Sequence, residues 1–250
     1  MPKIVGLVLP SLTVILWELL SRLNVLDPSM IPAPSDVLLA ALSGISSGEL
    51  VNYVAISILR VAKGFLLASV AGVSAGLAVG WSPTVRAMVD PFLSFLRQIP
   101  PVAWIPVFIM WFGIGEGSKV MVIAYAAFFP VFLNTETSVS QVCDTFLELG
   151  RVYRFTKAQM LTRVILPGSL GPVFAGLRLG LSASWRALVA AEMLASASGL
   201  GYMIVISREL VRPDVMFVGI VVVGLFGYLV DVGAIRLQRT VAPWSWQVRE

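Results

Sequence analysis

Charged side chains lie in a stretch that is otherwise apolar enough to cross a membrane, residues 173–195. Each ionisable residue inside a bilayer costs roughly 2.5–3.5 kcal/mol on insertion scales, so such residues are functional candidates. Arg186 could recognise an anion in transit through its planar guanidinium, or it could pair with an acid on a neighbouring span and fix packing. Both alternatives remain open. The candidate translocation residues are Ser182, Trp185, Arg186 and Glu192.

A basic stretch, "LELGRVYRFTKAQMLTRVILPG", occupies residues 147–168. Thr145 and Glu148 fit a capping box, which predicts that a helix begins there, and Pro167 followed by Gly168 predicts its end. The basic side of this helix could face anionic lipid headgroups or dock a soluble partner. Glu148 could pair with a basic residue of that partner or cap its own helix. The basic residues are Arg151, Arg154, Lys157 and Arg163.

Several classes of chemistry lack their residues. The chain has no histidine and one cysteine, Cys143, so it has no histidine-containing triad, no HExxH zinc site and no internal disulfide. "GIGEGSK", residues 113–119, resembles a phosphate loop only superficially, because Ser118 separates Gly117 from Lys119 and apolar helices flank it. We therefore expect no cofactor, no metal site and no ATP hydrolysis by this chain.

The composition indicates that much of this chain is surrounded by lipid rather than water. Of 250 residues, 58% are hydrophobic and 13% are charged, against about 25% charged in soluble domains. The sequence therefore predicts an all-α, polytopic membrane protein. A formal charge of +4 needs no nucleic-acid partner, because basic residues gather on the cytoplasmic loops of such proteins.

The apolar pattern predicts about six transmembrane helices in a single domain, residues 1–250. Gly72, Gly76 and Gly80 share one face of the second span, where another helix backbone can approach closely. Six spans put both chain ends on one side of the membrane, and the basic stretch indicates that this side is the cytoplasm. The expected parts are a first span at 4–20, amphipathic and lead-in helices at 35–63, a five-span core at 64–235 and a cytoplasmic helix region at 145–166. Within the core the spans are expected at 64–81, 102–112, 120–134, 173–195 and 215–235.

Four segments resemble one family. "FLELGRVYRFTKAQMLTRVILPGSL" is similar to the coupling loop of ATP-binding-cassette importer permeases, although the glycine of that motif falls at Arg154. "RQIPPVAWIPVFIMWFGIG", "GLRLGLSASWRALVAAEMLASASGLGYMI" and "LDPSMIPAPSDV" resemble the nitrate, sulfonate and taurine branch. The resemblance implies a type I importer permease fold in the inner membrane and covers nearly the whole chain. The residues it assigns to ATPase coupling are Glu148, Leu149, Gly150, Arg151, Tyr153, Arg154, Leu166 and Pro167.

The same resemblance implies the partners. They are two ATPase subunits that hydrolyse ATP, a second copy of the permease, an extracytoplasmic solute-binding protein and the lipid bilayer. The solute would be a small anion, and Arg186 would line its passage, while Glu192 would have a structural or gating role. An ion-coupled secondary transporter is the alternative, and it predicts paired repeats with carboxylates at broken midplane helices. The acids of this chain lie mostly at span ends, and no convincing repeat is present.

Overall fold

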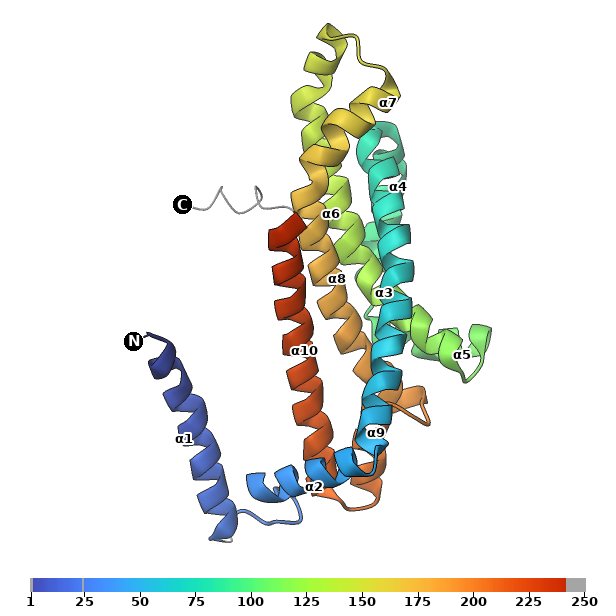
Figure 1. The fold of residues 1–250 in the computed structure, drawn as a ribbon. Coiled ribbons are helices and arrows are strands. Elements are labelled where there is room, and N and C mark those ends of the chain that lie inside the picture. The colour runs from blue at the N-terminus through green and yellow to red at the C-terminus, as the bar shows by residue number, and fades with distance from the viewer. Residues whose placement is uncertain (1, 24, 242–250) are drawn as a thin grey trace. The chain divides into compact units, whose positions relative to one another are not determined.

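The computed structural model describes residues 2–23 and 25–241, and these are almost entirely helical, with no strand among them (Figure 1). The predicted all-α class is therefore confirmed. The helices are α1 (Pro2–Arg22), α2 (Pro34–Ser46), α3 (Glu49–Trp81), α4 (Pro83–Leu96), the 3₁₀ turn η1 (Pro101–Trp104), α5 (Ile105–Phe112), α6 (Glu116–Val152), α7 (Lys157–Met160), the π-helical turn η2 (Leu161–Ile165), α8 (Leu166–Ala195), α9 (Leu200–Glu209) and α10 (Pro213–Val241).

The chain divides into two compact units. Unit 1 comprises residues 1–57 and 192–225, and unit 2 comprises residues 58–191 and 226–250. Three long helices, α3, α8 and α10, contribute residues to both units. The basic stretch and most of the apolar spans belong to unit 2.

Among the described residues, four helices are long and apolar enough to cross a membrane: Glu49–Trp81, Glu116–Cys143, Lys157–Ala195 and Pro213–Gln238. A fifth span results if α4 and the segment Pro101–Phe112, which are bent by 86° relative to each other, are counted together. The expected short third span at 102–112 is thus the second half of a broken pair. The break falls at Pro100 and Pro101, where proline removes backbone donors. α1 is a helix of 21 residues at the place of the expected first span, and its membrane crossing stays a prediction.

Several predicted boundaries are wrong. α3 runs without interruption from Glu49 to Trp81, so no boundary separates the lead-in helix from the second span at residue 64. α6 begins at Glu116, four residues before the span expected at 120–134, and extends far beyond residue 134. α3 continues through Gly64 and α6 through Pro130, so neither residue ends its helix. The pattern of hydropathy marks where a span ends rather than where its helix ends.

Glycines set the packing of unit 2. A Cβ atom built on Gly72 would lie 2.9 Å from Val131 Cγ1, one on Gly76 2.6 Å from Thr135 Cβ, and one on Gly80 2.8 Å from Val139 Cβ. All three contacts are to α6, so the glycine face of α3 lies directly against that helix.

Polar contacts fix the first elements of unit 1. The carboxylate of Glu18 on α1 accepts hydrogen bonds from the Ser35 backbone N–H at 3.0 Å and from the Ser35 hydroxyl at 2.9 Å. Arg22, one turn beyond Glu18, pairs with the same carboxylate at 3.0 Å. The start of α2, where Ser35 lies, is thereby joined to the end of α1.

Candidate coupling hairpin and translocation residues

The basic stretch forms a helical hairpin in unit 2, and it begins later than predicted. α6 continues through Thr145 and Glu148 to Val152, so Thr145 caps no helix and Glu148 has no capping role there. The N-cap is Thr156: its side chain accepts from the Gln159 N–H at 3.2 Å, and the Gln159 side chain accepts from the Thr156 N–H at 2.9 Å. The segment Thr-Lys-Ala-Gln matches the capping-box rule as well as Thr145–Glu148 does. The sequence therefore contains two matches to the rule, and the capping box forms at Thr156 and not at Thr145.

The turn between α6 and α7 contains a residue in the left-handed region. Arg154 has φ 53°, one of two non-glycine residues with positive φ among those described. This conformation lets the Phe155 N–H reach the Gly150 carbonyl at 2.9 Å and reverse the chain. The family motif has a glycine at this position, and glycine adopts positive φ without steric cost, which explains that preference. Here an arginine takes the same backbone conformation.

The helix does not stop at Pro167, contrary to the prediction. The segment Lys157–Ala195 is continuous over 39 residues. In the π-helical turn η2 the Leu166 N–H bonds to the Leu161 carbonyl, five residues back, and α8 follows directly with Pro167 in its first turn. Pro167 lies inside this continuous helix, where it donates no backbone hydrogen bond and its ring crowds the preceding turn. The widened turn η2 therefore allows the hairpin to continue into α8.

The hairpin exposes its charges. Glu148, Tyr153 and Arg154 are exposed, and Tyr153 is 70% so. No ion pair within the described part of the chain involves Glu148 or Arg154. Gly150 is buried, and a Cβ there would lie 2.8 Å from Met160 Sδ.

The remaining coupling candidates are less exposed or lie outside the description. Leu166 is half-buried and Pro167 is exposed. The side chains of Leu149 and Arg151 lie outside the described part of the structure. Six of the eight predicted coupling residues have described side chains, and all six lie in this one hairpin. The left-handed turn at Arg154 forms its tip.

The polar residues of α8 form a stripe. Arg178, Ser182 and Arg186 are four residues apart, which puts them on one helix face. Arg178 pairs with Asp231 of α10 through two hydrogen bonds of 2.8 and 3.0 Å. Arg186 is exposed and has no acidic partner among the described residues. The ion pair that was expected as an alternative role for Arg186 is therefore made by Arg178.

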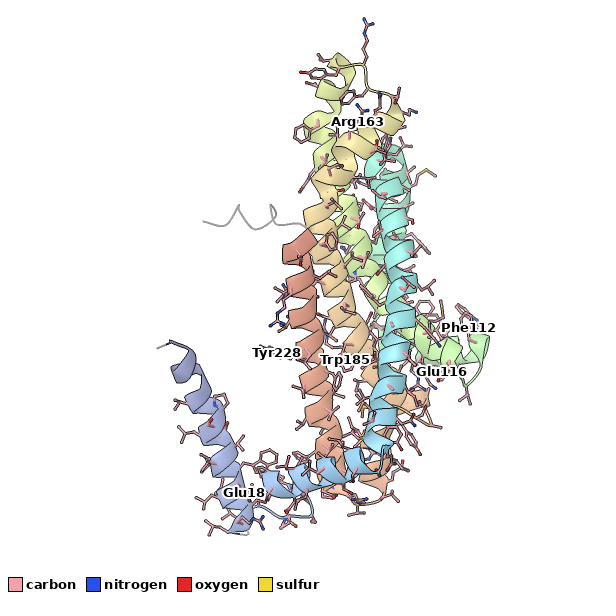
Figure 2. All side chains as sticks on the ribbon, viewed as in Figure 1. Glu18, Phe112, Glu116, Arg163, Trp185 and Tyr228 are labelled. Carbon is pink, nitrogen blue, oxygen red and sulfur yellow. The ribbon has the colours of Figure 1, made fainter. Side chains whose placement is uncertain are left out.

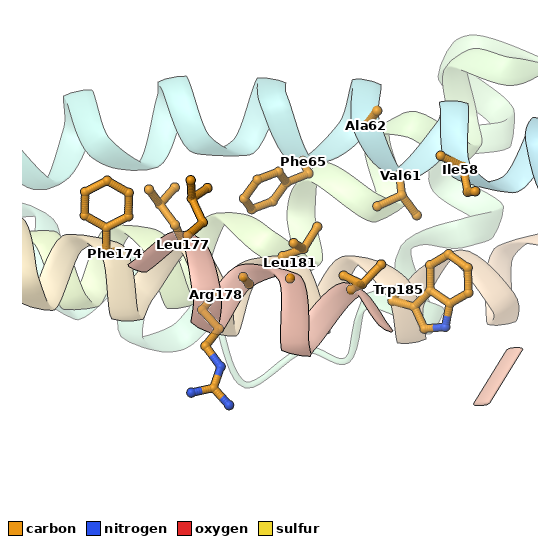
Figure 3. Close-up of a pocket in the computed structure, with 13 residues that line it drawn as sticks. Ile58, Val61, Ala62, Phe65, Phe174, Leu177, Arg178, Leu181 and Trp185 are labelled. Carbon is orange, nitrogen blue, oxygen red and sulfur yellow. The ribbon is translucent and has the colours of Figure 1, made fainter. Parts of the chain in front are cut away.

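Trp185 lies on a different side of α8 and is 5% exposed. Its ring stacks on Phe226 with centroids 6.4 Å apart, and a Cβ on Gly227 would lie 3.0 Å from it. It also lines an apolar cavity of about 480 Å³ between α3, α8 and α10, where the Arg178 guanidinium points away from the apolar side chains (Figure 3). Trp185 packs α8 against α10 within unit 2, and Figure 2 labels it on α8. It does not share the exposed stripe.

Glu192 belongs to unit 1 and is fully buried. Its carboxylate accepts from the Ser57 hydroxyl at 2.8 Å and from the Gly201 N–H at 2.9 Å. The Ser57 oxygen in turn accepts from the Leu200 N–H at 3.0 Å. Two of the donors at the start of α9, which have no partner inside the helix, are thus satisfied by this pair. Glu192 positions α9, a role the sequence indicated only as structural or gating.

The ion pairs below and the role of Ser57 were not predicted from the sequence. Arg60 is 1% exposed and donates hydrogen bonds of 2.6 and 2.8 Å to the carboxylate of Glu116. Arg86 pairs with Glu136 at 2.6 Å. A charged residue within a continuous 33-residue helix such as α3 was the available signal. Among the described residues, no group of His, Cys, Asp or Glu is placed to hold a metal ion.

Long apolar helices, a hairpin of exposed charges and a polar stripe on one span define a class, the multi-pass membrane subunit of a transporter. The family model described as "Binding-protein-dependent transport system inner membrane component" matches residues 50–243, and the chain belongs to that family. It is a permease subunit of an ATP-binding-cassette importer, with ATPase and binding-protein partners, and ATP hydrolysis belongs to the ATPase. This membership excludes the alternative of an ion-coupled secondary transporter.

Curated relatives cover most of the chain. A putative aliphatic sulfonates transport permease protein of Bacillus subtilis is 38% identical over 96% of this chain and 87% of its own length. The taurine transport system permease protein of Escherichia coli is 35% identical over 93% and 86%. A bicarbonate transport system permease protein of Synechococcus elongatus is 34% identical over 74% and 67%. The predicted branch of the family is therefore confirmed.

A solved structure shows the same fold. An inward-facing crystal form of the MetNI methionine ABC transporter matches with a TM-score of 0.68 at 18% identity, covering 79% of this chain and 98% of that one. The predicted type I importer permease fold is confirmed by this likeness.

Proposed function

We propose that this permease carries a small anion of the sulfonate, taurine or bicarbonate kind across the inner membrane. The relatives named above carry these solutes in their names, and each solute bears an anionic group. The observation that carries the proposal is Arg186, an exposed arginine on a candidate span with no acidic partner among the described residues. Such a residue in a span faces a protein interior or an aqueous path rather than lipid.

Arg186 contacts the anion only in transit. A guanidinium offers bidentate recognition to a sulfonate or carboxylate group. Ser182 adds a hydroxyl on the same face, and the Arg178 charge is already neutralised by Asp231. One unpaired cation rather than two keeps the contact weak enough for release, as conduction requires.

The hairpin at 145–166 is the ATPase docking element, and it lies in the cytoplasm with both chain ends. Two copies of the permease work with two ATPases and an external binding protein. Support comes from the exposed Glu148 and Arg154 and from the continuous helix Lys157–Ala195, which joins the hairpin rigidly to the polar stripe. A shift imposed on the hairpin therefore moves α8 as a rigid body.

The coupling part is tested with Glu148→Arg. Co-purification with the cognate ATPase and uptake into proteoliposomes are compared with wild type and with Glu148→Gln. We expect the reversed charge to abolish coupled uptake while the variant remains folded. Unchanged solute-dependent uptake in Glu148→Arg contradicts the docking role.

The pathway part is tested with Arg186→Gln and Arg186→Lys. Uptake of taurine, an aliphatic sulfonate and bicarbonate is measured with the binding protein saturated, together with ATPase activity. We expect Arg186→Gln to lower the maximal uptake rate at least tenfold and the lysine variant to retain part of it. Equal rates in wild type and Arg186→Gln exclude the anion contact.

A further inference from the structure

The coupling hairpin and the end of α3 line a cavity of about 200 Å³. A dry cavity of about 150 Å³ is large enough to admit a benzene ring. The hairpin cavity can therefore hold an aromatic or a large aliphatic side chain. Its lining includes Trp81, Cys143, Phe155, Lys157, Met160 and Ile165.

The inner wall of this cavity cannot close on itself. Cys143, Met160 and Ile165 are at most 7% exposed and pack in one cluster with Val139. α7 already touches α6 at Gly150, where even a Cβ would approach Met160 Sδ to 2.8 Å. Empty apolar cavities destabilise a protein in proportion to their volume, so an apolar group that enters gains free energy.

The outer side of the cavity has the composition of a protein interface. Phe155 is 36% exposed, its ring lies 6.0 Å from that of the exposed Tyr153, and Lys157 is exposed beside it. Aromatic residues with a polar rim are typical of protein interfaces, and contiguous exposed apolar surface marks binding sites. The Lys157 ammonium favours a carboxylate in whatever covers this patch.

We propose that the hairpin cavity receives an aromatic or large aliphatic side chain of the ATPase, next to a carboxylate that pairs with Lys157. The inference rests on the proposed docking role of the hairpin. Contact between the two subunits is then reciprocal, because the hairpin enters a cleft of the ATPase while a side chain of the ATPase enters the hairpin.

Cys143 serves as the reporter, since it is the single cysteine of the chain and lines the cavity. The purified permease, in detergent and in lipid nanodiscs, is treated with a small neutral thiol reagent, alone and with a cysteine-free form of its ATPase. We expect labelling of the permease alone and at least tenfold slower labelling in the complex. Absence of labelling in the permease alone shows that the cavity is closed and overturns the proposal.

Two variants test the occupant independently. Ile165→Phe fills the cavity, and Lys157→Glu reverses the charge at its opening. Each should weaken ATPase binding about tenfold, measured by titration on nanodiscs. Arg236→Glu is the control, because Arg236 is an exposed arginine on α10, outside the hairpin, and does not line the cavity. It should weaken binding by less than threefold.

The outcomes separate this proposal from the docking role. An ATPase that binds without protecting Cys143, and with wild-type affinity for Ile165→Phe, overturns the cavity proposal and leaves docking intact. Protection in nanodiscs without ATPase, but not in detergent, identifies a lipid chain as the occupant and also overturns it. Failure of the ATPase to bind wild-type permease overturns both.

Discussion

Glu192 and Glu148 are both helical carboxylates of this chain, and their surroundings are opposite. Glu192 is fully buried and accepts hydrogen bonds from Ser57 and from the start of α9. Glu148 is exposed on the hairpin and has no ion pair within the described residues. A buried charge survives only when the protein itself satisfies it, whereas an exposed charge remains available to a partner. The structure thus gives Glu192 a role in positioning α9, and it leaves Glu148 available for the partner recognition proposed above.

The comparison predicts its largest effect at Glu192. Glu192→Leu leaves the Gly201 N–H and the Ser57 hydroxyl buried without their acceptor, and we expect a loss of about 3 kcal/mol in the free energy of unfolding. Denaturant unfolding in micelles measures it. Glu192→Gln is the control, because its amide oxygen can still accept one hydrogen bond. A leucine variant as stable as wild type would show that the site positions nothing.

Ser57→Ala should have the next largest effect. The substitution removes the donor to Glu192 and leaves the Leu200 N–H without its acceptor, which costs about 1.5 kcal/mol. The same unfolding assay, applied also to the double variant with Glu192→Leu, measures the coupling between the two residues. We expect the loss of stability in the double variant to be smaller than the sum of the losses in the two single variants, because the two side chains act as one unit. Strict additivity argues against a shared site.

At the hairpin the effect on stability should change sign. Arg154→Gly relieves a left-handed conformation, and we expect a gain of roughly 0.5–1 kcal/mol after the extra unfolded-state entropy of glycine is subtracted. Thermal unfolding measures the gain. Arg236→Gly, at an exposed position inside the regular helix α10, should instead destabilise by about 1 kcal/mol. A loss of stability in Arg154→Gly contradicts the backbone assignment.

The smallest effect is expected at Glu148 itself. Glu148→Gln should change the free energy of unfolding by less than about 0.5 kcal/mol, as for exposed residues without internal partners. The measurement is compared with the change in the free energy of unfolding of Glu192→Gln in the same micelles. A large loss at Glu148 would mean that the hairpin has an internal partner, and the distinction between the two carboxylates would fail.

The sequence was sufficient for the fold class, the family and the location of the hairpin. Hydropathy reports burial in lipid, so it located spans but not the ends of helices such as α6 that continue beyond the membrane. Thr145 and Thr156 both matched a local capping rule, and only the tertiary path of the chain decides between them. The left-handed turn at Arg154 was detectable only through the glycine of the family motif.

The pairing of charges could not be predicted. Arg178 and Arg186 share one face of one helix, and which of them meets an acid depends on Asp231, more than 40 residues away on α10. Ser57 has no sequence signal at all, because a serine inside an apolar helix is common and its partner, Glu192, lies 135 residues away. The pairing at these sites depends on contacts between residues that are far apart in the sequence, and such contacts cannot be predicted from the pattern of a single sequence.

The widened turn η2 gives the hairpin unequal arms. From the middle of η2 the helix extends about 9 Å to Lys157 and about 42 Å to Ala191, at 1.5 Å per residue. A pivot at η2 would turn a movement of 1 Å at the short arm into nearly 5 Å at the far end of the long one. A small displacement of the hairpin by the ATPase would then produce a larger displacement at the far end of α8. The force available at that far end would be smaller in the same proportion.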